Sequence, residues 1–305
     1  MTGAGAGELV AAREQDFAGA LVDGDDGVPD LFGVGRDPTL EELSLDNQLE
    51  RLRTGNEVWS KESVKTNFEG AVSLSAVVST DVHKQIEAIV FNDGGTGITS
   101  GLAASARIFV GASYLTGTAE RELLGCIPLE YSIEWEQGGM VSYSLSLAYA
   151  DEKPGSSADL TTATRATEGS SLPFHAATFA VDGTDIQDLQ SATLSISDIS
   201  RLQYGGSPTA NRGVIANPQA SLDVEAIFTT PSRTQLARGA PNGPPPDRLD
   251  SVTGSVTLEK PDGTTLSEYQ LSALKPASYD WNNVLGTDDT TDPLSLNVDG
   301  GVSIA

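Results

Sequence analysis

The chain has 305 residues, a formal net charge of −25 and one cysteine. This length allows two domains with proper hydrophobic cores. Forty-three acidic residues against 18 basic ones repel nucleic-acid phosphates and anionic membranes, which argues against a conventional DNA-binding protein. A single cysteine excludes an intrachain disulfide, and no apolar run approaches the roughly 20 residues of a membrane span. We expect a soluble protein, made inside the cell without a signal peptide.

The excess of acidic residues, together with few lysines and few aromatics, is typical of proteins that work in concentrated salt. High ionic strength screens the self-repulsion that such a charge creates in dilute solution. The alternative is an acidic protein from an ordinary environment.

Residues 1–38 are rich in glycine, alanine and aspartate, and they predict a flexible N-terminal arm that becomes ordered against a neighbouring subunit. The aspartates between Asp23 and Asp30 have a spacing similar to that of a calcium-binding loop. Position twelve of such a loop is Val34, where an EF-hand requires a bidentate glutamate. We therefore expect no metal site in the arm.

A first unit is predicted over residues 39–152. Its opening stretch, Leu40–Arg53, fits either a strand or an acidic helix, and the pattern leaves both open. Next come a strand over 71–79 and a helix over 81–91, and a further strand begins at Arg107. The clearest hairpin joins the alternating runs 127–135 and 141–149, each with one apolar face that must pack on another layer.

A polar, turn-rich stretch over 153–172 predicts a linker, and a second unit follows over 173–305. The elements expected in this unit are strands over 177–181, 186–196, 220–229 and 294–302, a helix over 231–239, and a hairpin of 255–260 with 267–271. Turns are expected at Asp182–Gly183 and at Asp262–Gly263.

The two units share residues at a nearly constant spacing of about 150. Four matches occur in the same order along both units. They are 43–47 with 194–198, Thr80 and Gln85 with Thr230 and Gln235, Pro128 and Tyr131 with Pro276 and Tyr279, and 144–147 with 295–298. Several matches in one order at one spacing predict a tandem duplication.

No constellation of residues indicates catalysis, so we expect no enzyme and no catalytic, cofactor or metal residues. His83 is interpreted as a polar residue on a helix face, and His175 has no nearby carboxylate pattern. Cys126 lies in an apolar run and is expected in the core. Glu130 and Glu134 lie more than ~10 Å apart along one strand, too far to share a proton, and are expected to face solvent.

The order of these parts resembles that of the major tail tube proteins of long-tailed, siphovirus-like viruses. The resemblance covers roughly residues 39–303. It rests on the strand and helix near 71–91, the run Leu124–Trp135, and the run 178–183 followed by 188–196. It implies a mainly β fold with two tandem β-sandwich units, each with a short flanking helix. The inner sheets would join across subunits into a β-barrel ring. The acid excess implies a halophilic archaeal host.

The resemblance implies a structural virion protein that self-assembles into stacked rings, which form the tail tube for genome delivery. A duplicated chain would make a homotrimeric, pseudo-sixfold ring, with a homohexamer as the alternative. Further partners would be tape-measure, tail terminator and baseplate proteins. Genomic DNA would pass through without specific binding, and neither a membrane nor a cofactor is involved. The protein would be located in the virion tail after assembly in the host cytoplasm. The alternative function is a duplicated β-sandwich decoration or adhesin binding module.

Overall fold

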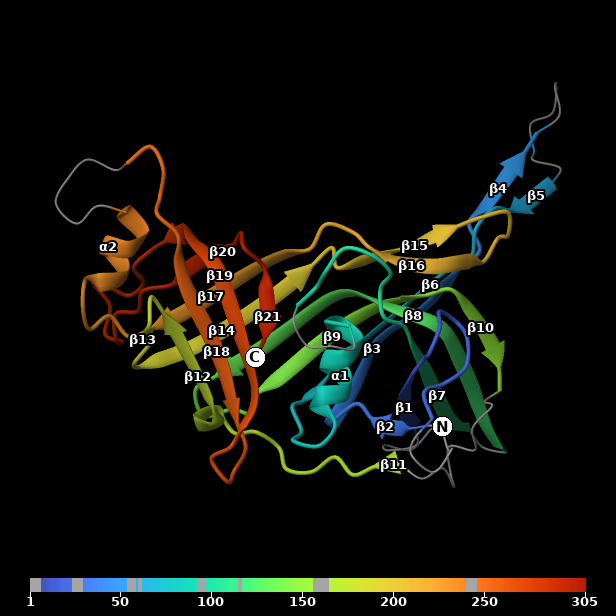
Figure 1. The fold of residues 1–305 in the computed structure, drawn as a ribbon, viewed down its shortest axis with the longest axis horizontal. Coiled ribbons are helices and arrows are strands. Elements are labelled where there is room, and N and C mark those ends of the chain that lie inside the picture. Colours follow the sequence, from blue (N-terminus) through green and yellow to red (C-terminus); the bar gives the residue numbers. More distant parts are fainter. Residues whose placement is uncertain are drawn as a thin grey trace.

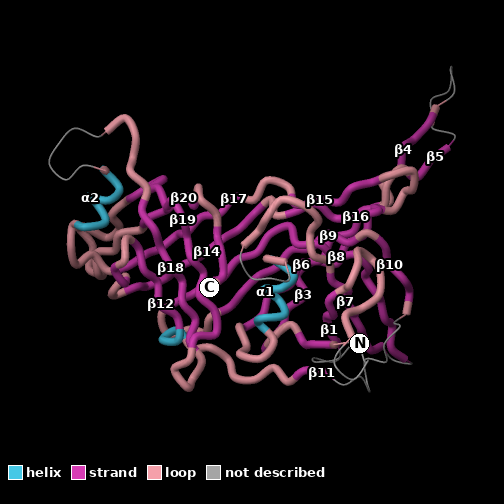
Figure 2. Tube along the Cα trace, viewed as in Figure 1, coloured by secondary structure: helices cyan, strands magenta, loops and turns pink. Residues whose placement is uncertain are grey.

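The computed structural model describes residues 7–23, 30–53, 59, 62–92, 97–114, 117–155, 165–239 and 246–305. Strands dominate these residues, and both α-helices are short (Figure 2). The main sheet curls strongly along the molecule, with the first half of the chain at one end and the second half at the other (Figure 1). The expected mainly β fold is confirmed.

The first half of the chain contributes β1 to β10 and α1. Their bounds are β1 Gly7–Arg13, β2 Leu31–Gly33, β3 Arg36–Asp46, β4 Leu49–Leu52, β5 Glu62–Lys65, β6 Glu69–Val77, α1 His83–Val90, β7 Ala106–Tyr114, β8 Gly117–Glu136, β9 Ser142–Tyr149 and β10 Asp151–Pro154. Antiparallel neighbours follow the order β2–β1–β7–β8–β9–β6–β3. The strand β10 pairs with the first part of β8, and β4 and β5 form a separate hairpin.

The second half contributes β12 to β21 and α2. Their bounds are β12 Ala177–Val181, β13 Thr184–Asp185, β14 Leu189–Ser197, β15 Ser200–Tyr204, β16 Ala210–Ile215, β17 Gln219–Ala226, α2 Ser232–Arg238, β18 Val252–Glu259, β19 Thr265–Tyr279, β20 Leu294–Val298 and β21 Val302–Ile304. Between the halves lie β11 Arg165–Ala166, which pairs with β2, and the short 3-10 helix η1 Phe174–Ala176.

The two halves have the same strand order. In the second half, antiparallel neighbours run β13–β12–β18–β19–β20–β17–β14. The strand β21 pairs with the first part of β19, as β10 does with β8, and β15 and β16 form a separate hairpin like β4 and β5. Each strand from β1 to β10 therefore has a counterpart from β12 to β21 at the same step of the chain.

The register between strands also agrees. Leu43 lies opposite Val72 in the first half, and Leu194 lies opposite Leu222 in the second. Pro128 of β8 lies opposite Leu147, with a β-bulge after it, and Pro276 of β19 lies opposite Leu296, again with a bulge after it. A bulge adds one residue to one strand of a pair, so its recurrence at one position is a specific feature of both halves.

One strand pair joins the two halves into a single sheet. The strand β14 pairs antiparallel with the last part of β8, where Ala192 lies opposite Trp135 and Ile196 lies opposite Tyr131. The side chains of these four residues are buried. This pair is called the internal joint below.

Alternating burial explains why these segments form strands. Every second residue of β9 is buried, with Tyr143, Leu145, Leu147 and Tyr149 on the core face and three serines and an alanine on the other. Such period-2 alternation places one face of the sheet against the core. The helix α1 lies in the middle of the molecule and buries Ile86, Ile89 and Val90 among other residues, whereas α2 at the outer end buries none (Figure 1).

The prediction of a flexible arm is wrong for residues 7–13. These residues form β1, which pairs along its length with β7 of the same chain, and Val10, Ala11 and Ala12 are fully buried. The reason is a short apolar run, Leu9–Ala12, that fits one edge of the first half's own sheet. Of the four aspartates with the calcium-like spacing, Asp25 and Asp26 lie outside the described residues.

One open alternative is decided and two expectations need correction. Leu40–Arg53, for which the pattern allowed a strand or a helix, forms the strands β3 and β4, separated at Gln48, where φ is +41°. The strand expected over 294–302 is divided into β20 and β21 by a turn at Asp299–Gly300. The match of 144–147 with 295–298 is displaced by two residues, because the paired register places Leu147 with Leu296.

Candidate functional site

The residues considered for chemistry lie apart from one another. Cys126 is fully buried, and burial raises the pKa of its thiol well above the ordinary value, as befits a core residue. Glu130 and Glu134 are exposed, as expected. His175 lies in η1, with its ring nearly perpendicular to that of Phe174. Within the described ranges, no group of three His, Cys, Asp or Glu side chains could hold a metal ion, and no helix could span a membrane.

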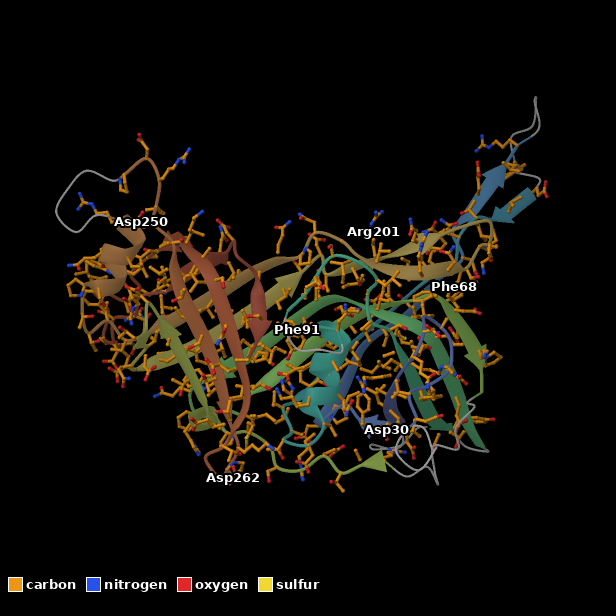
Figure 3. All side chains as sticks on the ribbon, viewed as in Figure 1. Asp30, Phe68, Phe91, Arg201, Asp250 and Asp262 are labelled. Carbon is orange, nitrogen blue, oxygen red and sulfur yellow. The ribbon has the colours of Figure 1, made fainter. Side chains whose placement is uncertain are left out.

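His83 is buried, although the sequence suggested only a polar residue on a helix face. Its Nε2 lies 2.9 Å from the hydroxyl of Tyr269 and 3.4 Å from that of Tyr131. Tyr269 also donates a hydrogen bond to Glu87, one turn after His83 on α1. Phe91, labelled in Figure 3, packs its ring against both tyrosines at the end of the helix. These four polar residues, His83, Glu87, Tyr131 and Tyr269, are called the interior cluster below.

The interior cluster stabilises the charged form of its carboxylate. Burial on its own raises the pKa of Glu87, but the hydrogen bond and electrostatic interaction with His83, aided by the Tyr269 hydroxyl, outweigh it. The pKa of Glu87 falls from 4.5 to about 2. All four side chains are buried in protein, so the cluster has no access for a substrate and serves to hold α1 between β8 and β19.

The sequence offered little signal for this cluster. Tyr131 was identifiable as a core-facing residue from its alternating strand, but Tyr269 lies 186 residues from His83 along the chain. Glu87 looks like an ordinary helix-surface carboxylate until β19 covers it.

The strand β3 forms an exposed edge of the main sheet. Among the residues that the structure describes, it pairs with β6 on one side and with no strand on the other, and ten of its eleven residues are exposed. Leu40 and Leu45 are among them, with exposed fractions of 38% and 43%. An exposed strand edge carries unpaired N–H and C=O groups that can pair with another chain.

The end of β19 is the second open position. In the first half, the last part of β8 is covered by β14 through the internal joint. The corresponding end of β19 pairs with β20 but, within the described residues, with no strand at the place that β14 takes on β8. Trp281, Val284 and Leu285 follow there and are highly exposed. A group of exposed large apolar residues commonly marks an interaction surface.

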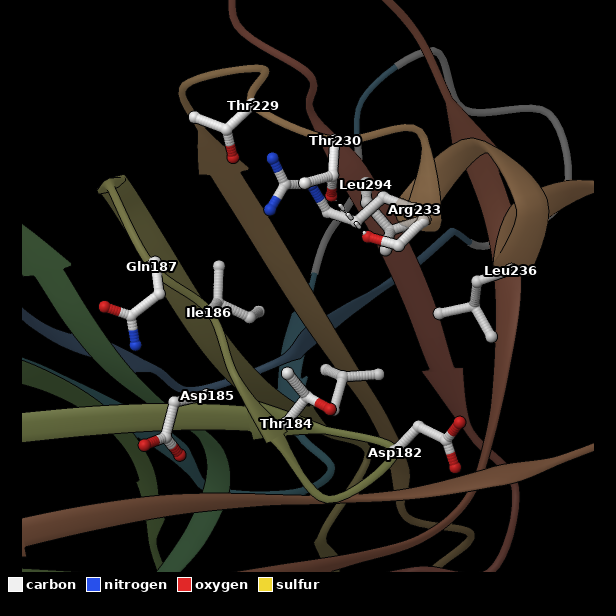
Figure 4. A pocket seen from close by; sticks show the side chains of 12 residues that line it. Asp182, Thr184, Asp185, Ile186, Gln187, Thr229, Thr230, Arg233, Leu236 and Leu294 are labelled. Atoms are coloured by element: carbon white, nitrogen blue, oxygen red, sulfur yellow. Dashed lines mark hydrogen bonds between the residues drawn. The ribbon is translucent and has the colours of Figure 1, made fainter.

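A hollow beside α2 is the third open feature. It has a volume of about 320 Å³ and lies between the β12–β13 turn and the helix, with Ile186, Leu236 and Leu294 on its wall (Figure 4). Arg233 also lines the hollow, and its guanidinium donates two hydrogen bonds to Asp292, which is fully buried. The matching position of the first half holds His83 in the interior cluster.

These open edges suit a protein that associates with copies of itself, and the family comparison agrees. A family model described as phage tail tube protein matches residues 15–300. The chain belongs to this family. Phage tail tube proteins are typically structural, so the chain is a structural protein of the phage tail, and its place is the tail of the virion.

Other comparisons add little. No curated protein matches the chain. A chain in the cryo-EM structure of the anti-feeding prophage baseplate, 6-fold symmetrised, is similar over 42% of this chain and 90% of its own length. Its sequence identity is 15% and the TM-score is 0.30. The predicted resemblance to tail tube proteins is confirmed at the level of the family, and the halophilic archaeal host stays a prediction.

Proposed function

We propose that three copies of this tail tube protein close into a ring of six similar units, and that such rings stack into the tube through which the genome is delivered. One observation carries the proposal. The internal joint pairs β14 with the end of β8, whereas their counterparts, β3 and the end of β19, are both open. A ring of three copies forms when β3 of each chain pairs with β19 of the next.

The internal joint fixes the register of this proposed contact. Within the chain, Ser195 lies opposite Ser132 and Leu194 lies opposite Ile133. The corresponding residues at the open edges are Ser44 with Asp280 and Leu43 with Trp281. The exposed Leu45 takes the place of Ile196, which is buried in the internal joint.

The different burial of the helices supports the same arrangement. In the first half, α1 is covered by Tyr269 of the second half. The helix α2 has no buried residue and an open hollow beside it. A neighbouring copy in the ring would supply this cover.

The strand number is compatible with a conduit. Four strands of each half continue across the internal joint, namely β3, β6, β9 and β8 in one half and β14, β17, β20 and β19 in the other. Three copies would form a closed barrel of about 24 strands. Barrels of 16–18 strands are already wide enough to enclose an aqueous channel. The net charge of −25 lets DNA slide past without being held.

Cysteine cross-linking tests the ring. Directly opposite residues of an antiparallel pair lie about 4.5–5.5 Å apart, within the range that a disulfide spans. We expect S44C/D280C to form disulfides between chains in assembled protein, with trimers as the largest closed product. The pair S132C/S195C is the matched control, since it should close within one chain. Cys126 is fully buried and should not compete.

A shifted pair and electron microscopy complete the test. S44C/S278C is displaced by two residues from the proposed register and should cross-link much less. End views in negative stain should show six lobes per ring with three-fold differences. Particles that never elongate at any salt concentration, together with no cross-link from S44C/D280C, would instead favour a decoration or adhesin module. Tape-measure, tail terminator and baseplate proteins are the further partners that we propose.

A further inference from the structure

The two separate hairpins of the chain occupy the same place in their halves. β4–β5 follows β3, and β15–β16 follows β14. Their registers agree, with Leu49 opposite Lys65 in one hairpin and Ser200 opposite Ile215 in the other. Their surroundings are very different.

The hairpin β15–β16 lies across the internal joint onto the first half of the chain. Ile199, just before it, donates its N–H to the carbonyl of Leu129 at 3.0 Å, and the hydroxyl of Tyr204 donates to the carbonyl of Phe68 at 2.8 Å. Gly213 lies against Ile127, where a Cβ atom would come within 2.5 Å. Figure 3 labels Phe68 beneath this hairpin and Arg201 on its outer side.

The hairpin β4–β5 instead projects away from the rest of the molecule (Figure 1). Every residue of both strands is exposed, including Leu49, Leu52 and Val64 at 58%, 42% and 39%. Three exposed apolar side chains on a two-stranded ribbon are unfavourable in water, and such a ribbon is marginally stable by itself.

The surface that would receive it is open in the second half. Leu129 and Phe68, which β15–β16 covers, correspond to Ala277 and Pro218, and both of these are exposed. The charges also suit each other. The described part of the hairpin exposes Arg51, Arg53 and Lys65 against Glu50 and Glu62, whereas residues 246–305 carry ten acidic and three basic residues.

We propose that β4–β5 is a clasp that docks on the second half of a neighbouring copy of this chain, as β15–β16 docks on the first half of its own. The inference rests on the proposed ring and adds a second contact to it. Arg53 would lie beside Gln219 of the neighbour, as Tyr204 lies beside Glu69 within the chain. Because the clasp belongs to the first half and its seat to the second, copies can join only head to tail.

A second cross-link tests the clasp independently of the sheet contact. R53C/Q219C, joined by a short bifunctional maleimide, should link neighbouring chains in assembled protein. Y204C/E69C is the matched control and should link within one chain. Interchain products from both R53C/Q219C and S44C/D280C support the clasp and the ring.

Other outcomes separate the two proposals. Cross-linking by S44C/D280C without R53C/Q219C would overturn the clasp and leave the ring. No interchain product from either pair would overturn the ring and the clasp with it. In tubes assembled from isotope-labelled and unlabelled rings, mass spectrometry shows whether Arg53→Cys is linked to a chain of the same ring or of the ring stacked on it. Links to the stacked ring would also overturn the clasp as a contact within one ring.

A hairpin variant measures how much the clasp contributes. L49E/V64E changes only exposed side chains, so the unassembled chain should unfold at the same urea concentration as the wild type. We expect the concentration at which rings form to rise at least about tenfold, which corresponds to about 1.4 kcal/mol. An unchanged assembly concentration would contradict the clasp.

Discussion

The hydroxyl of Tyr269 in β19 lies 2.9 Å from Nε2 of His83 at the start of α1, and it also donates a hydrogen bond to Glu87. One phenol thus satisfies two buried polar groups of a helix that lies in the other half of the chain. Buried polar groups that lose their partner retain the full cost of leaving water.

We expect Tyr269→Phe to lower the free energy of unfolding by about 1–3 kcal/mol, because it removes this hydroxyl and leaves His83 and Glu87 with fewer partners. Urea unfolding of the unassembled chain measures the change. Tyr114→Phe is the control, since Tyr114 is 55% exposed and its change should stay within about 0.5 kcal/mol. Equal effects of the two substitutions would show that the cluster contributes nothing to stability.

The lowered pKa of Glu87 predicts a specific pH dependence. A carboxylate whose pKa falls from 4.5 to about 2 on folding stabilises the folded state above pH 4.5 and loses that contribution as the pH falls toward 2. We expect Glu87→Gln to be less stable than the wild type at pH 7 by up to about 3 kcal/mol. The difference should shrink steadily below pH 4.5. Unfolding of both proteins between pH 7 and pH 2.5 tests this, with the exposed Glu134→Gln as the control.

Much of the fold could be predicted because the local pattern is strong. The hairpin through Tyr131 and Tyr143 alternates clearly, and Asp182–Gly183 marks a turn in which both residues have positive φ. The matches of Pro128 with Pro276 and of 43–47 with 194–198 are correct in register. The match of 144–147 is not, because a period-2 pattern fits itself equally well after a shift of two residues.

The rest of the structure depends on contacts that local patterns do not contain. The spacing of Leu45, Leu49 and Leu52 suits a helical face, but these leucines lie on two strands separated by a turn. Leu9–Ala12 is too short a run to indicate which sheet edge it joins. Tyr269, the hydrogen-bond partner of His83, is distant in the chain. The open edges at β3 and β19 can be recognised only by comparison with the internal joint, where their counterparts β14 and β8 are paired.

The ion pair of Arg233 and Asp292 should hold α2 to the second half. Asp292 is fully buried, and α2 buries no residue of its own. We expect Asp292→Ala to cost about 3–5 kcal/mol, because it leaves a largely buried guanidinium without its carboxylate. Urea unfolding measures the cost, and hydrogen exchange should show lost protection in 232–238. Asp289→Ala, at an exposed position, is the control. Retained protection in Asp292→Ala would contradict this role.

Gly70 of β6 lies opposite Tyr149 of β9 with no space for a side chain. A Cβ atom at residue 70 would lie 2.0 Å from Cζ of the Tyr149 ring. We expect Gly70→Ala to lower the free energy of unfolding by about 1–3 kcal/mol, because the ring must move within a packed core. Gly206→Ala is the control, since a Cβ there meets nothing within 4 Å. Equal unfolding midpoints for the two variants would contradict the close packing.

The net charge of −25 predicts that the stability of the folded protein rises with salt concentration. The distance over which charges interact falls from about 30 Å at 0.01 M salt to about 3 Å at 1 M, so screening removes most of the self-repulsion of the folded state in this range. We expect the melting temperature to rise by several degrees, mostly below 1 M KCl. This rise corresponds to an increase in the free energy of unfolding on the order of 1–2 kcal/mol.

Two comparisons separate charge screening from general effects of the solvent. Sucrose at matched osmolality does not screen charges and should raise the melting temperature less than KCl does. Replacing several exposed acidic residues by their amides, for example Asp288→Asn with Asp289→Asn and Glu130→Gln, should flatten the dependence on KCl below 1 M. An unchanged slope in that variant would show that charge repulsion is not the cause. A melting temperature independent of KCl would favour an acidic protein adapted to ordinary salt.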